Sequence, residues 1–146
     1  MSTVRILLVD DFAPFLSYVR NVLAEYPEFD VIGEAADGLE ALEKAKALQP
    51  SLILLDIGLP KLDGIQVATQ LRTIAPLCRV LFLTAQSSRD MVPLALSIGA
   101  LGYVSKWSAV RDLVPAVKAV CSGNQFVSRR FASCDLPDPI KLQTRL

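Results

Sequence analysis

The chain has 146 residues, which suits one compact domain, and its fifteen basic and fifteen acidic residues give a formal net charge of zero. That balance disfavours a protein that binds nucleic acid through bulk positive charge. The chain has no histidine, which excludes Ser-His-Asp and Cys-His catalysis and histidine-containing zinc sites.

Five short apolar runs alternate with amphipathic stretches along the chain. Runs of this kind, rich in Val, Ile and Leu, are typical of a parallel sheet that helices cover on both faces. The pattern predicts a (βα)5 fold, a doubly wound α/β protein with a five-stranded parallel sheet. The expected strands are Val4–Val9, Asp30–Ala35, Leu52–Leu55, Val80–Leu83 and Tyr103–Val104.

The helices are expected between and after these strands. Apolar residues at three- and four-residue steps mark the buried face of each helix, and these faces include Phe12, Leu39, Leu94 and Val110. We expect the fourth helix to begin near Ser88 and to end by Gly99. After the fifth helix, we expect residues 1–123 to form the domain and residues 124–146 to be an extension or a linker remnant.

The cysteines and the apolar stretches bear on the compartment. Cys78, Cys121 and Cys134 are odd in number and show no C-x-x-C spacing, which favours a reducing cytoplasm. No signal peptide is recognisable at the N-terminus. The longest stretch without charge, residues 91–105, is shorter than a membrane-spanning helix requires, so no membrane association is expected.

Polar residues follow four of the expected strands at the point where each one ends. In an open parallel sheet ligands bind at the carboxyl ends of the strands, and the strand order 2-1-3-4-5 places the first and third strands side by side. Their end residues then bring three carboxylates together, which repel one another unless a cation lies among them. The residues are Asp10 and Asp11, Asp56, Thr84 and Lys106.

This set predicts a site for phosphoryl chemistry. Ligands that are all oxygen favour a hard ion, most plausibly Mg²⁺, with Mn²⁺ as a substitute. Lys106 and Thr84 offer an ammonium and a hydroxyl to phosphoryl oxygens. Asp56 would then be the nucleophile that forms an aspartyl phosphate.

Each residue also has a simpler interpretation. Asp11 could cap the first helix, and Asp56 could be a turn residue ahead of Gly58. Thr84 could be a strand-end hydroxyl, and Lys106 could be solvated. Because all four fall on one edge of one predicted sheet, the joint functional interpretation is favoured over four separate coincidences.

The motifs resemble those of CheY-like response regulator receiver domains of the NarL/FixJ type, from Val4 to about Gly123. The resemblance implies that Asp56 accepts the phosphoryl group. It further implies that Asp11, Asp56 and the Gly58 carbonyl ligate Mg²⁺, with Asp10 acting through water. Thr84, Lys106 and the Ile57 and Ala85 amides would hold the phosphoryl oxygens, and Thr84 and Tyr103 would form the switch. The segments that carry the resemblance are ILLVDD (6–11), LILLDIGLPKLDG (52–64), FLTA (82–85) and GALGYVSK (99–106).

The resemblance also implies partners. A sensor histidine kinase or a phosphotransfer protein would donate the phosphoryl group, and the chain would be a signalling domain and not a turnover enzyme. Phosphorylation would switch the face made by the fourth helix, fifth strand and fifth helix, and that face would control the partner. It is a candidate homodimer surface, although core packing explains its valines and leucines equally well.

Two alternatives stay open on sequence grounds. The chain could be a receiver that acts by itself, or the receiver portion of a DNA-binding transcriptional regulator. The helix-turn-helix usual in this type is absent here, so we expect no nucleic acid binding by the chain itself. A Mg²⁺-dependent aspartyl-phosphate phosphatase of the haloacid dehalogenase type is disfavoured, because Gly58 stands where such enzymes need a second acid.

Overall fold

A computed structural model describes residues 3–85 and 90–128 of the chain. The described part forms one parallel sheet in the order β2-β1-β3-β4-β5-β6, which confirms the predicted order 2-1-3-4-5 and adds a sixth strand. The strands are β1 (Val4–Val9), β2 (Phe29–Ala35), β3 (Leu52–Leu55), β4 (Arg79–Thr84), β5 (Gly102–Ser105) and β6 (Phe126–Val127). The helices are α1 (Ala13–Leu23), α2 (Gly38–Leu48), α3 (Gly64–Ile74), α4 (Met91–Ser97) and α5 (Ala109–Cys121), with a short 3-10 helix, η1 (Lys106–Ser108), before α5.

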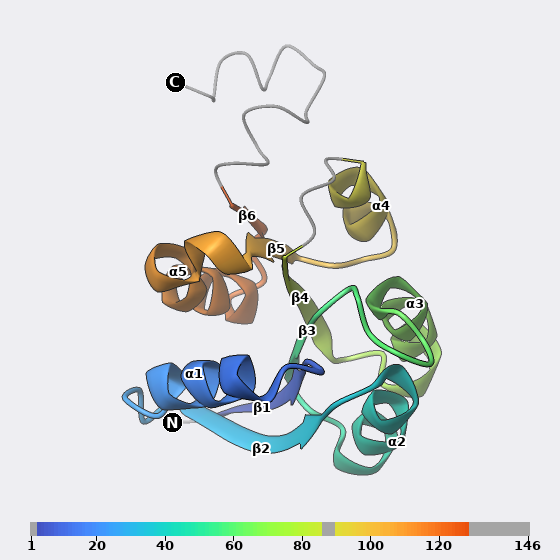
Figure 1. Ribbon diagram of the computed structural model, residues 1–146, viewed down its shortest axis with the longest axis horizontal. Helices are drawn as coiled ribbons and strands as arrows, with labels where there is room; N and C mark the ends of the chain where they lie inside the picture. The colour runs from blue at the N-terminus through green and yellow to red at the C-terminus, as the bar shows by residue number, and fades with distance from the viewer. Residues whose placement is uncertain (1–2, 86–89, 129–146) are drawn as a thin grey trace.

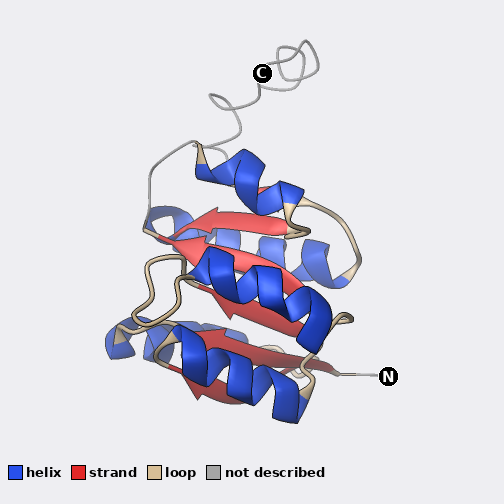
Figure 2. Ribbon diagram, turned by 90° about the vertical axis from the view of Figure 1, so that its right-hand side faces the viewer, coloured by secondary structure: helices blue, strands red, loops and turns tan. Residues whose placement is uncertain are grey.

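The helices form two layers, one on each face of the sheet. Helices α1 and α5 cover one face, and α2, α3 and α4 cover the other (Figures 1 and 2). Each face has its own apolar core: Ile6 and Leu8 of β1 point into the α1–α5 core, whereas Leu7 and Val9 point into the other. All four residues of β3 are buried, as a central strand covered on both faces requires.

The register of the sheet aligns the ends of the strands that carry the polar residues. Val9 pairs with Leu55 across β1 and β3, and Thr84 pairs with Ser105 across β4 and β5. Because neighbouring parallel strands end at one edge, the residues that follow them meet there.

The loop after β3 is held by backbone contacts that leave little room for side chains. Gly64 N–H donates to the Ile57 carbonyl at 2.8 Å, and Leu59 N–H donates to the same oxygen at 2.9 Å. A capping box between Asp63 and Gln66 then begins α3. The start of α3 is thereby fastened to the backbone that follows β3.

Four apolar residues expected on buried helix faces are exposed instead. Phe12, Leu39, Leu94 and Val110 are 58%, 50%, 43% and 91% exposed, so the prediction of an inward position for each is wrong. In α4, Val92 and Ala95 form the buried face in place of Leu94, because small residues let a helix approach the sheet closely. In α5, the buried apolar positions are Ala109, Leu113, Ala116, Val117 and Val120.

The C-terminal part of the described chain was not predicted to join the sheet. Strand β6 pairs in parallel with β5, with Phe126 opposite Gly102 and Val127 opposite Tyr103. The expected boundary at residue 123 therefore precedes the last strand of the sheet. The expected start of α4 near Ser88, Cys134 and the stretch 129–146 lie outside the described residues.

We expect Gly64→Ala to destabilise the fold by about 2–3 kcal/mol. A methyl group at this position would overlap the Asp56 carbonyl and would lie 2.7 Å from Ile57 Cα, and both are backbone atoms that cannot move aside cheaply. The matched control is Gly33→Ala, whose methyl group would meet only the ends of two leucine side chains, the nearest at 3.2 Å. Urea unfolding of both variants measures the difference, and equal losses would contradict the prediction.

Candidate functional site

Three carboxylates meet at the carboxyl edge of the sheet. Asp10 and Asp11 follow β1, Asp56 follows the neighbouring strand β3, and each residue offers a carboxylate oxygen within 4.8 Å of the others. Backbone bonds fix the positions, because Asp56 N–H donates to the Val9 carbonyl at 3.1 Å. Asp10 and Asp56 are buried, whereas Asp11 is exposed. The structure thus brings together the three acids that the sequence singled out.

Lys106 lies against two of these acids. Its ammonium is 2.6 Å from Asp10 Oδ2 and 3.3 Å from Asp56 Oδ2. Burial alone would lower the pKa of Lys106, but the hydrogen bond to Asp10 and the charges of Asp56 and Asp10 outweigh burial and raise it. The lysine is therefore held as a cation between the end of β1 and the end of β3.

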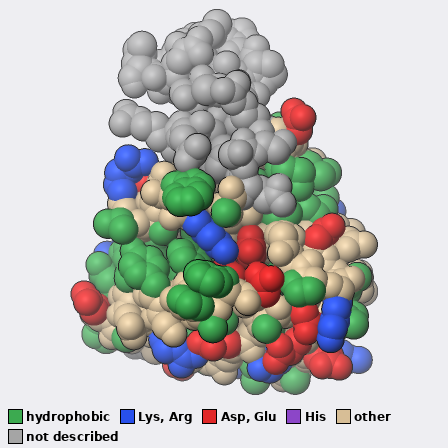
Figure 3. Space-filling view, in the orientation of Figure 1, with side chains coloured by type: hydrophobic (Ala, Val, Ile, Leu, Met, Phe, Trp, Pro, Cys, Tyr) green, Lys and Arg blue, Asp and Glu red, His purple; other side chains and the backbone are tan. Residues whose placement is uncertain are grey.

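An aromatic ring completes the surroundings of the ammonium. Lys106 Nζ lies 4.7 Å from the centre of the Phe15 ring on α1, a distance at which the ring face attracts a cation. Acidic, basic and hydrophobic side chains accordingly occur together on this face of the molecule (Figure 3). Sequence analysis assigned no such contact to Phe15; its position four residues after Asp11, on the first turn of α1, was the available signal.

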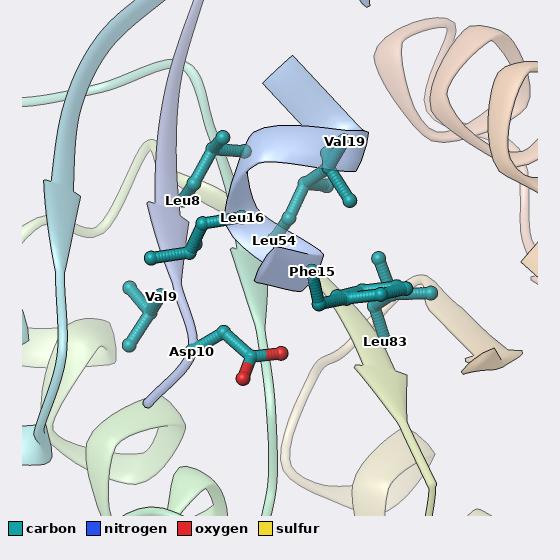
Figure 4. Close-up of a pocket in the computed structure, with 8 residues that line it drawn as sticks. All are labelled: Leu8, Val9, Asp10, Phe15, Leu16, Val19, Leu54 and Leu83. Carbon is teal, nitrogen blue, oxygen red and sulfur yellow. The ribbon is translucent and has the colours of Figure 1, made fainter. Parts of the chain in front are cut away.

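Asp10 is a carboxylate in an apolar setting. It lines a small cavity of about 10 Å³, and its carboxylate lies at the edge of a group of apolar side chains from β1, β3, β4 and α1, below the Phe15 ring (Figure 4). The other lining residues are Leu8, Val9, Phe15, Leu16, Val19, Leu54 and Leu83. Burial raises the pKa of Asp10 above its ordinary value, and the charge of Asp56 adds to the rise. Hydrogen bonds from Lys106 and from Phe12 N–H, the latter at 2.9 Å, act against it.

An open depression of about 330 Å³ lies beside the acids. Asp56, Gly58, Thr84 and Ala85 line it, so the nucleophile candidate shares one space with the hydroxyl-bearing residue and with two residues of the loops after β3 and β4. The Ile57 side chain is buried in the core and does not line this space. A substrate group could reach the Asp56 carboxylate from this side.

Tyr103 is fully buried in β5, three residues before Lys106. Its ring lies 6.1 Å from the ring of Phe82 on β4, in a tilted arrangement, and belongs to the core under α2, α3 and α4. The Tyr103 ring is therefore completely buried in the core, whereas a tyrosine on a strand is often only half-buried.

The described residues of the site carry more negative than positive charge. Three carboxylates face one ammonium, and every candidate ligand is an oxygen atom at close range. This donor set fits a hard divalent cation such as Mg²⁺ and does not fit a soft metal. With a cation present, the Asp56 carboxylate and the hydroxyl-bearing Thr84 would border one open space, with an ammonium 3.3 Å from that carboxylate, which is a set of groups suited to phosphoryl transfer.

The fold is a doubly wound parallel α/β sheet with an acidic site at its carboxyl edge, and comparison with known proteins places it in a family. Residues 6–118 match the response regulator receiver domain family, and the chain belongs to it. It is therefore a receiver domain of two-component response regulators, as the motifs predicted. No helix of the described residues is long and apolar enough to cross a membrane.

Individual relatives agree with this assignment. The transcriptional regulatory protein PdtaR of Mycobacterium tuberculosis is 36% identical over 120 residues, which are 81% of this chain and 57% of PdtaR. Among solved structures, a LuxR-family two-component response regulator from Aurantimonas sp. SI85-9A1 superimposes with a TM-score of 0.85 at 32% identity, over 90% of this chain and 94% of that one. The signal receiver domain of NarL from Mycobacterium tuberculosis gives a TM-score of 0.80 at 36% identity, over 85% and 100%.

The fraction of the other protein that this chain covers differs between PdtaR and the two solved structures. The chain spans just over half of PdtaR but nearly all of the two solved receiver chains. The similarity therefore concerns the receiver part of longer regulators. The predicted NarL type is also confirmed by these neighbours.

We expect Asp10→Asn to raise the melting temperature by a few degrees at neutral pH, in the absence of divalent cations. The pKa of Asp10 is raised on folding, so protonation favours the folded state, and that stabilisation is lost as pH rises through the folded-state pKa. The neutral amide avoids this loss. The gain should shrink as the pH falls from neutral through the raised pKa of Asp10, because Asp10 itself then becomes protonated.

Thermal unfolding in EDTA across this pH range measures the effect. Asp30→Asn, at an exposed position of β2, is the matched control and should show no comparable gain. A melting temperature of Asp10→Asn at or below that of the wild type at neutral pH would refute the electrostatic argument.

Proposed function

We propose that this chain accepts a phosphoryl group on Asp56 from the phosphohistidine of a sensor histidine kinase or a phosphotransfer protein. The observation that carries the proposal is the position of Asp56, whose carboxylate borders an open depression and lies 3.3 Å from the Lys106 ammonium. A carboxylate oxygen of Asp56 attacks phosphorus, the phosphorus–nitrogen bond breaks, and the histidine nitrogen keeps the electron pair. The product is an aspartyl phosphate.

Asp11, Asp56 and the Gly58 carbonyl are proposed to hold Mg²⁺, with Asp10 acting through a water molecule. The oxygen-only donor set within 4.8 Å supports this assignment. When bound, the ion neutralises negative charge on the phosphoryl oxygens and on the attacking carboxylate. The exposure of Asp11 gives the ion access from solvent.

The remaining groups are proposed to hold the phosphoryl oxygens. Lys106 would exchange one of its two carboxylate contacts for a phosphoryl oxygen, at no cost in charge pairing. Thr84 and Ala85 border the same depression as Asp56, so the Thr84 hydroxyl and the Ala85 amide start close to the incoming group. The Ile57 amide, adjacent to the nucleophile, is proposed as the second backbone donor.

Phosphorylation is proposed to bias a two-state equilibrium of the face formed by α4, β5 and α5. Thr84 ends β4 and pairs with Ser105 of β5, two residues after Tyr103, so a shift of Thr84 would be felt at the tyrosine. Leu94, Trp107 and Val110 leave apolar surface exposed on α4, η1 and α5. This face is proposed to contact the output partner, including a second copy of the chain in a homodimer.

The wider context is proposed from the relatives. The matched part is 57% of PdtaR, a transcriptional regulatory protein, so we propose that the receiver controls transcription in the cytoplasm as part of a longer regulator. A receiver that acts by itself is the alternative. DNA binding is not assigned to the described residues, which we propose act as a signalling domain and not as a turnover enzyme.

Incubation with acetyl phosphate and Mg²⁺ should add one phosphoryl group to the wild-type chain, detected by intact mass. Asp56→Asn should show no gain, because the amide is not a nucleophile, whereas the exposed-site control Asp30→Asn should behave as wild type. Lys106→Ala should slow the gain by about tenfold or more, because a charge-assisted contact to the phosphoryl group is lost. A gain that survives in Asp56→Asn, or steady hydrolysis of small phosphate esters, would contradict the proposal.

Mg²⁺ should raise the melting temperature of the wild type without any phosphoryl donor. A ligand that binds only the folded state stabilises it in proportion to the logarithm of its concentration over Kd. Asp11→Asn should lose most of this response, although the change at an exposed residue should leave the fold intact. A wild-type melting temperature that is insensitive to millimolar Mg²⁺ would argue against a metal site at these acids.

A further inference from the structure

A second polar cluster lies inside the fold, on the side of β5 away from the acids. Ser128 Oγ donates a hydrogen bond to Asp112 Oδ2 on α5 at 2.8 Å, and it accepts one from Ser105 N–H on β5 at 3.1 Å. Ser128 and Ser105 are buried, with 0% and 1% exposure, and Asp112 is 7% exposed. Three separate elements are therefore joined through one hydroxyl group.

Burial of this polar cluster costs free energy that an apolar cluster of the same volume would not cost. A buried carboxylate loses hydration, and hydrophobic residues of similar volume would fill the same space without that loss. Among the described residues, Asp112 forms an ion pair with its neighbour Arg111, whose side chain is 65% exposed. Ser128 N–H also donates to the Tyr103 carbonyl at 2.8 Å, so the serine is held through both backbone and side chain. Such a fully bonded arrangement fixes one conformation.

The cluster fixes the conformation of Ser105, the residue immediately before Lys106. Ser105 N–H is bound by Ser128, and Ser105 Oγ in turn accepts a hydrogen bond from Trp107 N–H at 3.1 Å, at the start of η1. The backbone on either side of Lys106 is thus held by hydrogen bonds. A lysine side chain is long and flexible, so the reach of its ammonium depends on where its Cα is held.

We propose that Ser128 and Asp112 are positioning residues for Lys106. Through Ser105 they hold the β5–η1 turn so that the lysine ammonium stays within hydrogen-bond distance of Asp10, at 2.6 Å, and close to Asp56, at 3.3 Å. Misplacement of such a group by about 1 Å is enough to slow chemistry severely. The effect on phosphorylation rests on the proposed function, in which Lys106 acts on the phosphoryl group; the effect on Lys106 itself does not.

The first measurement tests positioning without any phosphoryl donor. In Ser128→Ala, hydrogen exchange of the Ser105 amide should accelerate about fivefold to tenfold, as expected for the loss of one hydrogen bond. The ¹³C order parameter of the Lys106 Cε should fall. The matched control is Ser122→Ala, which removes a hydroxyl bonded only to the Lys118 carbonyl at the far end of α5. Unchanged exchange and unchanged lysine order in Ser128→Ala would overturn the proposal.

A pair of variants at Asp112 separates hydrogen bonding from charge and from folding. Asp112→Asn keeps an oxygen that can accept from Ser128, so lysine order should stay close to wild type. Asp112→Ala removes the acceptor and should reproduce the effect of Ser128→Ala. If Ser128→Ala proves too unstable to measure, the comparison of Asp112→Asn with Asp112→Ala still tests the proposal. Equal Lys106 order parameters in these two variants would contradict it.

The second measurement uses the initial rate of phosphorylation by acetyl phosphate with Mg²⁺. Ser128→Ala and Asp112→Ala should lower the rate about threefold to tenfold, whereas Ser122→Ala should not. In a Lys106→Ala background, Ser128→Ala should cause no further loss, because it acts through the missing lysine. Additive losses would show a merely structural role and would overturn the proposal. If the wild type accepts no phosphoryl group, the proposed function fails, while the exchange and order measurements still decide positioning.

Discussion

The ammonium of Lys106, shared between Asp10 and Asp56, is the interaction on which the rest of the site depends. It joins the ends of three strands, β1, β3 and β5, that are distant in sequence and are brought to one edge by the parallel sheet. Without it, two buried carboxylates would face each other with no positive charge, and such a pair is strongly unfavourable. The core therefore serves to hold opposite charges at a fixed spacing that a phosphoryl group can enter.

The same interaction explains why the site is poised for a ligand. One cation does not neutralise three acids, and burial already raises the pKa of Asp10. The unfavourable charge is tolerated because two large apolar cores, one on each face of the sheet, stabilise the fold independently of it. A bound cation and a phosphoryl group would relieve the imbalance, so binding energy is available at the acids.

The sequence predicted five of the six strands of the described sheet, their order and the residues at their ends, because these depend on local apolar runs and on one rule of sheet topology. The exact faces of the helices were less predictable: Leu94 fits a helical apolar stripe as well as Val92 does, and only packing against the sheet decides between them. The contact of Phe15 with Lys106 and the bonds of Ser128 join residues far apart in the chain. No local pattern marks such contacts, since a lone serine after two apolar residues has many possible roles.

Strand β6 determines where the chain is when it leaves the domain. Helix α5 ends near the start of β4, where Arg79 donates hydrogen bonds to the Val120 and Cys121 carbonyls, so it ends at the amino edge of the sheet. Because β6 runs parallel to β5, it carries the chain back across the sheet, and Ser128 lies level with the end of β5, next to the turn that bears Lys106. The chain therefore leaves Ser128 at the same edge of the sheet as Asp56. A short linker that starts at this edge would keep an attached domain within a small volume around it. The local concentration of that domain would then be high, so even a weak preference for one state of the receiver would have a large effect.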